Sequence, residues 1–185
     1  RRQYLHLALG STLLTYHLRP FSLILQREYP DRIECLERDS REDALLIVYR
    51  DGIERVLAVS RDAGDTYQEV LRMTTDGLIV CAVSPHMTWC AFYKDASGNL
   101  MLRRSIDGGA SWESAVQVQV DSVPAQGTPL DADYDARSHA LVLVYETASG
   151  DRRVAVSYDD GATFTMIRFN PSQVGYKPTR LLRVG

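Results

Sequence analysis

The stretch "SIDGGASW", Ser105–Trp112, has the composition of a tight turn between two strands. An Asp side chain can accept hydrogen bonds from backbone N–H groups a few residues ahead, so Asp107 can close an Asx-type turn. Gly109, two positions later, can take a positive φ without a Cβ clash. The aromatic side chain can fold back and shield the hairpin. The same residue types also occur in catalytic elbows, phosphate cradles and metal loops, so the stretch alone leaves these alternatives open.

Repetition of the stretch favours a structural turn. "SRDAGDTY" begins at Ser60 and "SYDDGATF" at Ser157, so the copies start at residues 60, 105 and 157, which are 45 and 52 residues apart. A catalytic loop is rarely needed three times, whereas a structural turn is needed once in each repeating unit. The residues that we interpret as structural in the three copies are Ser60, Asp62, Gly64, Thr66, Tyr67, Ser105, Asp107, Gly109, Ser111, Trp112, Ser157, Asp159, Gly161, Thr163 and Phe164.

The segments around each copy repeat as well. An apolar run ends at Tyr49, Tyr93 or Tyr145, and a polar turn and a second run then lead into the copy. One more strand-like run stands before each tyrosine, and another follows the aromatic residue. The runs are short, rich in Val, Tyr and Thr, and separated by turn residues, which is typical of β-strands. Each unit therefore holds four strands, which is the size of one β-propeller blade.

The predicted fold is an all-β propeller of four-stranded antiparallel blades, with the repeated turn between strands three and four. We expect one propeller domain divided into a partial blade without the turn at 1–30, blades at 31–77, 78–121 and 122–170, and the first strand of a further or ring-closing blade at 171–185. The last strand could complete the first blade and close a four-bladed ring. We favour a fragment of a larger ring, because the chain lacks an initiator Met and its last strand stops at Gly185.

Charge and hydropathy exclude some classes of partner. The net charge is −3, whereas a nucleic-acid phosphate backbone is bound by concentrated Lys and Arg, so we expect no nucleic-acid partner. No run of about 18 apolar residues is present, so no membrane-spanning helix is expected.

Three cysteines do not make a disulfide framework. Cys81 and Cys90 would face each other across a four-residue loop, Ser84–Met87, and buried thiols are favoured over a disulfide there.

Metal and cofactor chemistry have few candidates. "DADYDARSH" places Asp131, Asp133 and Asp135 on one face of a strand, as at the start of a calcium loop. Ala136 stands where that loop needs Gly, and Val142 stands where it needs a bidentate Glu. We therefore favour a solvated acidic edge over a calcium site and expect no cofactor. His86 and His139 fall in predicted hairpin turns, and we interpret them as surface residues without partners.

The repeated stretch resembles the motif of the Asp-box (bacterial neuraminidase repeat) propellers, Ser-x-Asp-x-Gly-x-Thr-Trp. The middle copy has Ser111 in place of Thr, and the outer copies have Tyr67 and Phe164 in place of Trp. With its flanking strands the resemblance covers about 31–170. It implies the propeller fold. It does not define the function, because such repeats occur in sialidases, other glycosidases, sorting receptors, photosystem assembly factors and virion proteins.

The residues that a sialidase needs are not recognised in this sequence. A sialidase uses three Arg to hold the substrate carboxylate, a Tyr–Glu pair as nucleophile and an Asp as acid/base. The early aromatic-Arg-Ile/Leu-Pro motif of that family is not matched, since Arg19 directly precedes Pro20 and no aromatic residue directly precedes Arg19. Tyr145 and Glu146 are strand neighbours that point to opposite faces. We therefore assign no catalytic residue.

A non-catalytic structural or interaction propeller is the preferred function, as part of a larger protein or assembly. It would be extracellular or part of a virion, such as a bacteriophage tail component, with other protein subunits as partners. The alternative is a sialidase-like or other glycoside hydrolase, or a carbohydrate-binding propeller with a glycan partner. Trp89 and Trp112 are possible stacking platforms for a sugar, although the strand and the turn already account for them.

Overall fold

The computed structural model of the chain describes residues 4–18, 21–39, 44–75, 77–84 and 86–167. These residues form strands and turns and no helix. The described part therefore contains no helix that is long and apolar enough to cross a membrane. The chain divides into two compact units, Arg1–Thr74 and Thr75–Gly185, and each is described by itself.

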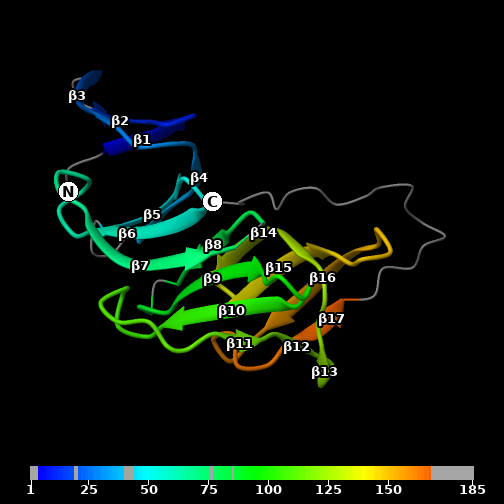
Figure 1. Cartoon of the computed structure of the whole chain (residues 1–185). Helices are drawn as coiled ribbons and strands as arrows, with labels where there is room; N and C mark the ends of the chain where they lie inside the picture. The colour runs from blue at the N-terminus through cyan, green and yellow to red at the C-terminus, as the bar shows by residue number, and fades with distance from the viewer. Residues whose placement is uncertain (1–3, 19–20, 40–43, 76, 85, 168–185) are drawn as a thin grey trace. The chain divides into compact units, whose positions relative to one another are not determined.

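The first unit contains two antiparallel sheets in which each strand pairs with its neighbour in sequence (Figure 1). The three-stranded sheet consists of β1 (Tyr4–Leu9), β2 (Thr12–Leu18) and β3 (Phe21–Glu28). The four-stranded sheet consists of β4 (Ile33–Asp39), β5 (Ala44–Asp51), β6 (Glu54–Ser60) and β7 (Gln68–Thr74). The β1–β2 turn is tied to the start of β4, because the Ile33 N–H donates to the Gly10 carbonyl at 2.8 Å.

The core of the first unit joins these two sheets. Leu13 of β2 lies in one buried cluster with Ile47 and Tyr49 of β5, and all three side chains are at most 5% exposed. The rings of Tyr29 and Tyr49 have centroids 4.7 Å apart. Full burial of each large apolar side chain stabilises the fold by roughly 1.5–3 kcal/mol. Consecutive residues of β5 from Ala44 to Tyr49 are all buried, so both faces of this strand are covered.

The second unit repeats the four-stranded arrangement twice. One sheet consists of β8 (Val80–Val83), β9 (Trp89–Lys94), β10 (Leu100–Ser105) and β11 (Val116–Gln117). The other consists of β14 (Thr128–Asp135), β15 (Ala140–Glu146), β16 (Arg152–Ser157) and β17 (Thr165–Ile167). Side chains from both sheets share one buried cluster, in which the rings of Phe92 and Phe164 meet edge to face with centroids 6.0 Å apart. The two sheets are therefore packed together through this core.

The strand that the sequence predicts after the second repeated turn is interrupted. Instead of one run, β11 is followed by a small hairpin of β12 (Gln119–Val120) and β13 (Val123–Pro124). Asp121 and Ser122 form its turn with φ of 50° and 64°. Such a turn is usually built with Gly or Asn, so the sequence carries no obvious signal for it.

The prediction that Cys81 and Cys90 face each other across the hairpin is wrong. The loop between β8 and β9 contains five residues, Ser84–Thr88, because Val83 pairs with Trp89. Cys81 is therefore opposite Ala91, and Cys90 is opposite Ala82. This offset of one residue places the two side chains on opposite faces of the sheet. None of the three cysteines, all of which are described, is in a disulfide.

Some predictions fall outside the described residues. The expected strand within 171–185 lies there, as do Arg19 and Pro20. The four-stranded antiparallel sheets are those that the sequence predicts, whereas the exact blade boundaries remain a prediction.

Candidate functional site

Each four-stranded sheet has two distinct ends. Because neighbouring strands are antiparallel, the turns between strands one and two and between strands three and four lie at the same end. We call it the box end, since the three repeated stretches connect β6 to β7, β10 to β11 and β16 to β17. The turn between strands two and three lies at the other end, which we call the opposite end.

At the box end the middle stretch forms a closed network of hydrogen bonds. The buried Ser105 hydroxyl donates to Asp107 Oδ1 at 2.8 Å and accepts from the Gly109 N–H at 2.8 Å. Asp107 Oδ1 also accepts from the Ser111 N–H at 2.9 Å, and Oδ2 accepts from the Ser111 hydroxyl at 2.6 Å. The carboxylate is thus held by its own turn.

The other two stretches have the same geometry. The Gly64 and Gly161 N–H groups each donate at 2.8 Å to the serine that begins their stretch. In both, a threonine hydroxyl donates to the second oxygen of the aspartate at 2.6 Å. Bonds of this kind support the structural interpretation, since each aspartate is engaged in fixing its turn. That interpretation remains our proposal for these residues.

The box ends also contact the preceding sheet within each unit. Gly161 packs so closely that an added Cβ would lie 3.2 Å from Leu102 and 3.3 Å from Leu141. Arg104 of β10 donates to the Asp160 carbonyl at 3.2 Å. In the first unit Arg27 of β3 likewise donates to the Asp65 carbonyl at 2.8 Å. The turn therefore connects one sheet to the next as well as closing its own hairpin.

The pKa of Asp107 gives a prediction for acid stability. Hydrogen bonds from the Ser111 side chain and backbone, and then from Ser105, lower this pKa to about 2. Because the folded pKa lies below the unfolded value of about 3.9, the contribution is present above about pH 4 and is lost as pH falls through about 2. We expect Asp107→Asn to flatten the pH dependence of unfolding in this window. NMR titration of Asp107 at its ordinary pKa would contradict this assignment.

The three aspartates of β14 are bonded to backbone N–H groups of their own strand and turn. In the described part of the chain, no group of three or more His, Cys, Asp or Glu residues is arranged to hold a metal ion. Asp135 instead accepts from the Arg137 N–H at 3.0 Å and from the Ser138 N–H at 3.3 Å, and so caps the β14–β15 turn. Asp131 and Asp133 accept hydrogen bonds from the backbone N–H groups of the next residue. The calcium hypothesis therefore has no support in this geometry.

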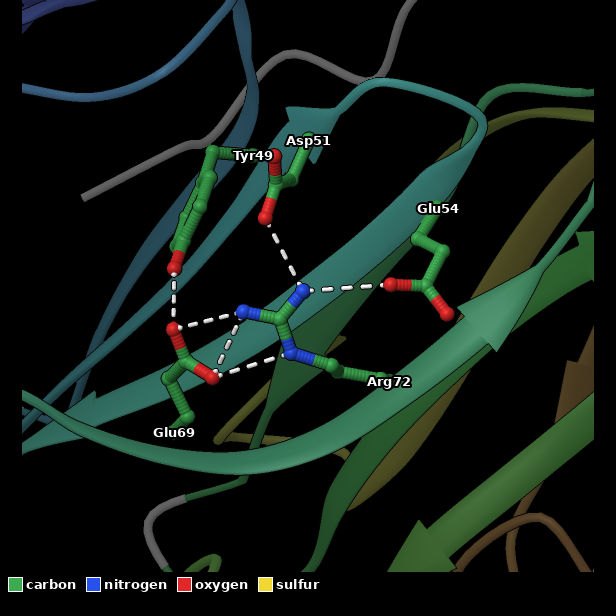
Figure 2. A network of polar contacts seen from close by, with 5 residues as sticks. All are labelled: Tyr49, Asp51, Glu54, Glu69 and Arg72. Carbon is green, nitrogen blue, oxygen red and sulfur yellow. Dashed lines mark hydrogen bonds and ion pairs between the residues drawn. The ribbon is translucent and has the colours of Figure 1, made fainter.

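One face of the first unit's four-stranded sheet carries a polar cluster, which extends from Glu69, near the box end, to Asp51 and Glu54 at the opposite end. The Arg72 guanidinium lies between the carboxylates of Asp51, Glu54 and Glu69 (Figure 2). The nitrogen–oxygen distances are 2.9, 3.1 and 2.9 Å, respectively. The Tyr49 hydroxyl donates to Glu69 Oε1 at 2.8 Å. The four charged side chains are 38–47% exposed, whereas Tyr49 as a whole is 5% exposed. We call these five residues the Arg72 network.

The hydrogen bonds of the network shift the pKa of Tyr49, Glu69 and Arg72. Hydrogen bonds from Tyr49 and then Arg72 lower the pKa of Glu69, so its carboxylate is charged. Burial, followed by the hydrogen bond to Glu69, raises the pKa of Tyr49. The Arg72 pKa is raised by its hydrogen bonds to Asp51, Glu69 and Glu54. Three carboxylates around one guanidinium and a neutral phenol leave the cluster with a net negative charge.

Sequence reasoning missed this network because its members come from three strands. Tyr49 on β5 pairs with Val56 on β6, which in turn pairs with Arg72 on β7. The available signal was the strand register, which aligns these positions on one face. Tyr145 and Glu146, which are neighbours in sequence, do not form a Tyr–Glu pair like that of Tyr49 and Glu69. Tyr145 is 2% exposed, and Glu146 binds Arg152 at 3.3 Å.

No protein-family profile and no curated protein sequence matches this chain. Solved structures do resemble it. The six-bladed fungal lectin of Aleuria aurantia, which recognises fucose, aligns with a TM-score of 0.61 at 9% identity, over 94% of this chain and 58% of the lectin. The NanB sialidase of Streptococcus pneumoniae aligns with a TM-score of 0.59 at 12% identity, over 82% of this chain and 27% of the sialidase.

Regucalcin of Agrobacterium tumefaciens, a calcium-binding protein, aligns with a TM-score of 0.58 at 17% identity, over 88% of this chain and 56% of regucalcin. The chain thus spans less than two thirds of the length of each of these proteins. At such low identities the likeness concerns the fold. Together with the four-stranded meanders and their box-end turns, it defines this chain as a β-propeller protein.

Proposed function

We propose that this chain belongs to a non-catalytic, carbohydrate-binding β-propeller, and that the Arg72 network is its sugar-binding site. The observation that carries the proposal is the half-exposed guanidinium framed by three carboxylates. Two proteins of similar fold act on carbohydrates, since the fungal lectin recognises fucose and NanB is a sialidase. These similarities favour a carbohydrate as the ligand. The expected virion or phage-tail role finds no support in these similarities and stays a prediction, as do protein partners.

The chemistry of the network suits sugar hydroxyls. Each hydroxyl is both a donor and an acceptor, so a saccharide is best held by fixed acceptors beside fixed donors. The carboxylates of Asp51 and Glu54 supply acceptors on one face of the sheet, and the Arg72 guanidinium, which is bonded to both, holds them side by side. Their ion pairs hold these groups in place before a ligand arrives, which lowers the entropy lost on binding. Trp89 is not a stacking platform, because it is 0% exposed.

The net negative charge of the network favours a neutral sugar. An anionic sugar such as a sialic acid would bring a fourth carboxylate against Asp51, Glu54 and Glu69, and like charges repel at short range. The single guanidinium is already bonded to all three carboxylates. We therefore expect a neutral hexose or deoxyhexose in this site.

A sialidase-like hydrolase is the second candidate, because Tyr49 and Glu69 form the kind of pair that serves as nucleophile and base in sialidases. Two observations favour binding over hydrolysis. Tyr49 is nearly buried, so its oxygen has little access to a substrate carbon. Its raised pKa also makes loss of the hydroxyl proton to Glu69 less favourable than for an ordinary tyrosine.

The test is calorimetric titration with L-fucose, D-galactose and N-acetylneuraminic acid. We expect a neutral sugar to bind, and Arg72→Ala to weaken that binding by about tenfold or more, since charge-assisted hydrogen bonds are lost. The matched control is Arg50→Ala, because Arg50 is an exposed arginine of the same sheet whose contacts are with Gly52 and Asp31. Arg50→Ala should bind like the unmodified protein.

Three results would overturn this function. Binding that is unchanged in Arg72→Ala would place the sugar elsewhere. Tight binding of N-acetylneuraminic acid alone would contradict the charge argument. Hydrolysis of a sialoside that disappears in Tyr49→Phe would establish the hydrolase instead.

A further inference from the structure

Two histidines from consecutive sheets of the second unit meet at the box end. His86 lies in the loop between β8 and β9, and His139 lies in the turn between β14 and β15. His86 Nε2 is 3.0 Å from His139 Nδ1, although 53 residues separate them in sequence. Their rings have centroids 4.9 Å apart, and both residues are exposed. The prediction that these histidines have no partners is therefore wrong.

Hydrogen bonds hold both loops in place. The His86 N–H donates to the Ser84 hydroxyl at 2.9 Å, and the Ser84 N–H donates to the Thr88 carbonyl at 2.8 Å. The Gly108 N–H donates to the Met87 carbonyl at 2.9 Å, which ties this loop to the neighbouring box turn. On the other side, the turn that carries His139 is capped by Asp135. The two imidazoles are thus presented by ordered backbone.

From this geometry we propose that His86 and His139 bind a divalent late transition metal ion, with Cu²⁺ or Ni²⁺ preferred to Zn²⁺. Imidazole nitrogen is a good ligand for all three ions and a poor one for Ca²⁺ or Mg²⁺. The exposed rings can turn so that one lone pair of each points to one ion, once the donor ring has taken the tautomer with its proton on the other ring nitrogen, so that both imidazoles stay neutral. Water completes the coordination.

The distance between the nitrogens is short enough for both to bind one ion. With metal–nitrogen bonds of about 2.0–2.1 Å, a separation of 3.0 Å gives an angle at the metal of about 91–97°. This is close to the right angle between neighbouring ligands in the square-planar and octahedral complexes of Cu²⁺ and Ni²⁺. Tetrahedral Zn²⁺ would need the nitrogens to separate to about 3.3 Å. A bound ion would link the sheet β8–β11 to the sheet β14–β17.

The experiment is titration of the unmodified chain at pH 8 with Cu²⁺, Ni²⁺, Zn²⁺ and Ca²⁺. We expect one Cu²⁺ per chain, binding in the order Cu²⁺, Ni²⁺, Zn²⁺, and no response to Ca²⁺. Either His86→Ala or His139→Ala should weaken Cu²⁺ binding by about tenfold or more, since one of two protein ligands is lost. His17→Ala removes another histidine of the chain and should leave binding unchanged.

Two further measurements separate this site from adventitious binding. The electron paramagnetic resonance spectrum of bound Cu²⁺ should show coupling to two imidazole nitrogens, and to one in either alanine variant. The melting temperature should rise with Cu²⁺ in the unmodified chain and in His17→Ala, and less in His86→Ala and His139→Ala, because an ion that binds the folded state stabilises it. Equal binding in His86→Ala and the unmodified chain, or a spectrum with fewer than two nitrogens, would overturn the proposal.

Discussion

Replacing Phe164 by alanine is expected to destabilise the second unit by about 3–5 kcal/mol, as is usual when a buried aromatic side chain is removed. Phe164 ends the third repeated stretch and is 3% exposed. Its ring packs edge to face against Phe92 of the preceding sheet. Its backbone is also bonded to the β12–β13 hairpin, since the Asp121 N–H donates to the Phe164 carbonyl at 2.9 Å. In the third box the aromatic position is thus part of the core between two sheets.

Tyr158 provides the matched control in the same turn. Its side chain is 72% exposed, so Tyr158→Ala should change the free energy of unfolding by no more than about 0.5 kcal/mol. Urea unfolding of both variants, followed by tryptophan fluorescence, measures the difference. Similar losses in the two variants would mean that Phe164 does not anchor the turn to the preceding sheet.

Replacing Gly127 by alanine should cost a comparable amount, about 3–5 kcal/mol. Gly127 has a φ of +144°, a conformation that side chains strongly disfavour. An added Cβ would overlap the carbonyl oxygen of Glu146, which is backbone and cannot move aside easily. The Gly127 N–H also donates to the Gly98 carbonyl at 3.0 Å, so a shift of this residue would disturb the β9–β10 turn. Conformational strain and overpacking therefore add together.

Gly98→Ala separates these two causes. Gly98 has a φ of +83°, yet a Cβ there would meet nothing within 4 Å. Only the conformational cost of about 1–2 kcal/mol should appear in this variant. Chemical denaturation of the two alanine variants gives the comparison. A Gly127 variant no less stable than the Gly98 variant would show that the close approach to Glu146 is not a constraint.

The repeated stretch predicted the four-stranded sheets because its information is local. A Ser, an Asp two residues later and a Gly two residues after that specify one turn. Because each copy of the turn belongs to one four-stranded sheet, the number of copies predicts the number of such sheets. The β12–β13 hairpin could not be anticipated, because Asp121 and Ser122 take positive φ without Gly or Asn. The prediction that Cys81 and Cys90 face each other was wrong for a similar reason. The loop has one residue more than predicted, which shifts the pairing of β8 with β9 and places the two side chains on opposite faces of the sheet.

Both candidate sites depend on contacts between residues that are distant in sequence. Arg72 meets Asp51 across a separation of 21 residues, and His86 meets His139 across 53. No spacing motif encodes such pairs. Such contacts can be predicted only when the strand register and the packing of one sheet on the next are known. For this reason the sequence predicted the turns but neither of these clusters.

The central claim is that the box turns are structural and that the Arg72 network, on one face of the first unit's four-stranded sheet, binds sugar. Backbone amide NMR during a titration with L-fucose and D-galactose tests it most directly. We predict saturable shifts at Asp51, Glu54, Glu69 and Arg72, and constant positions for the amides of Ser105–Trp112. Shifts that are confined to the box turns, or no shift with any neutral sugar, would contradict the account.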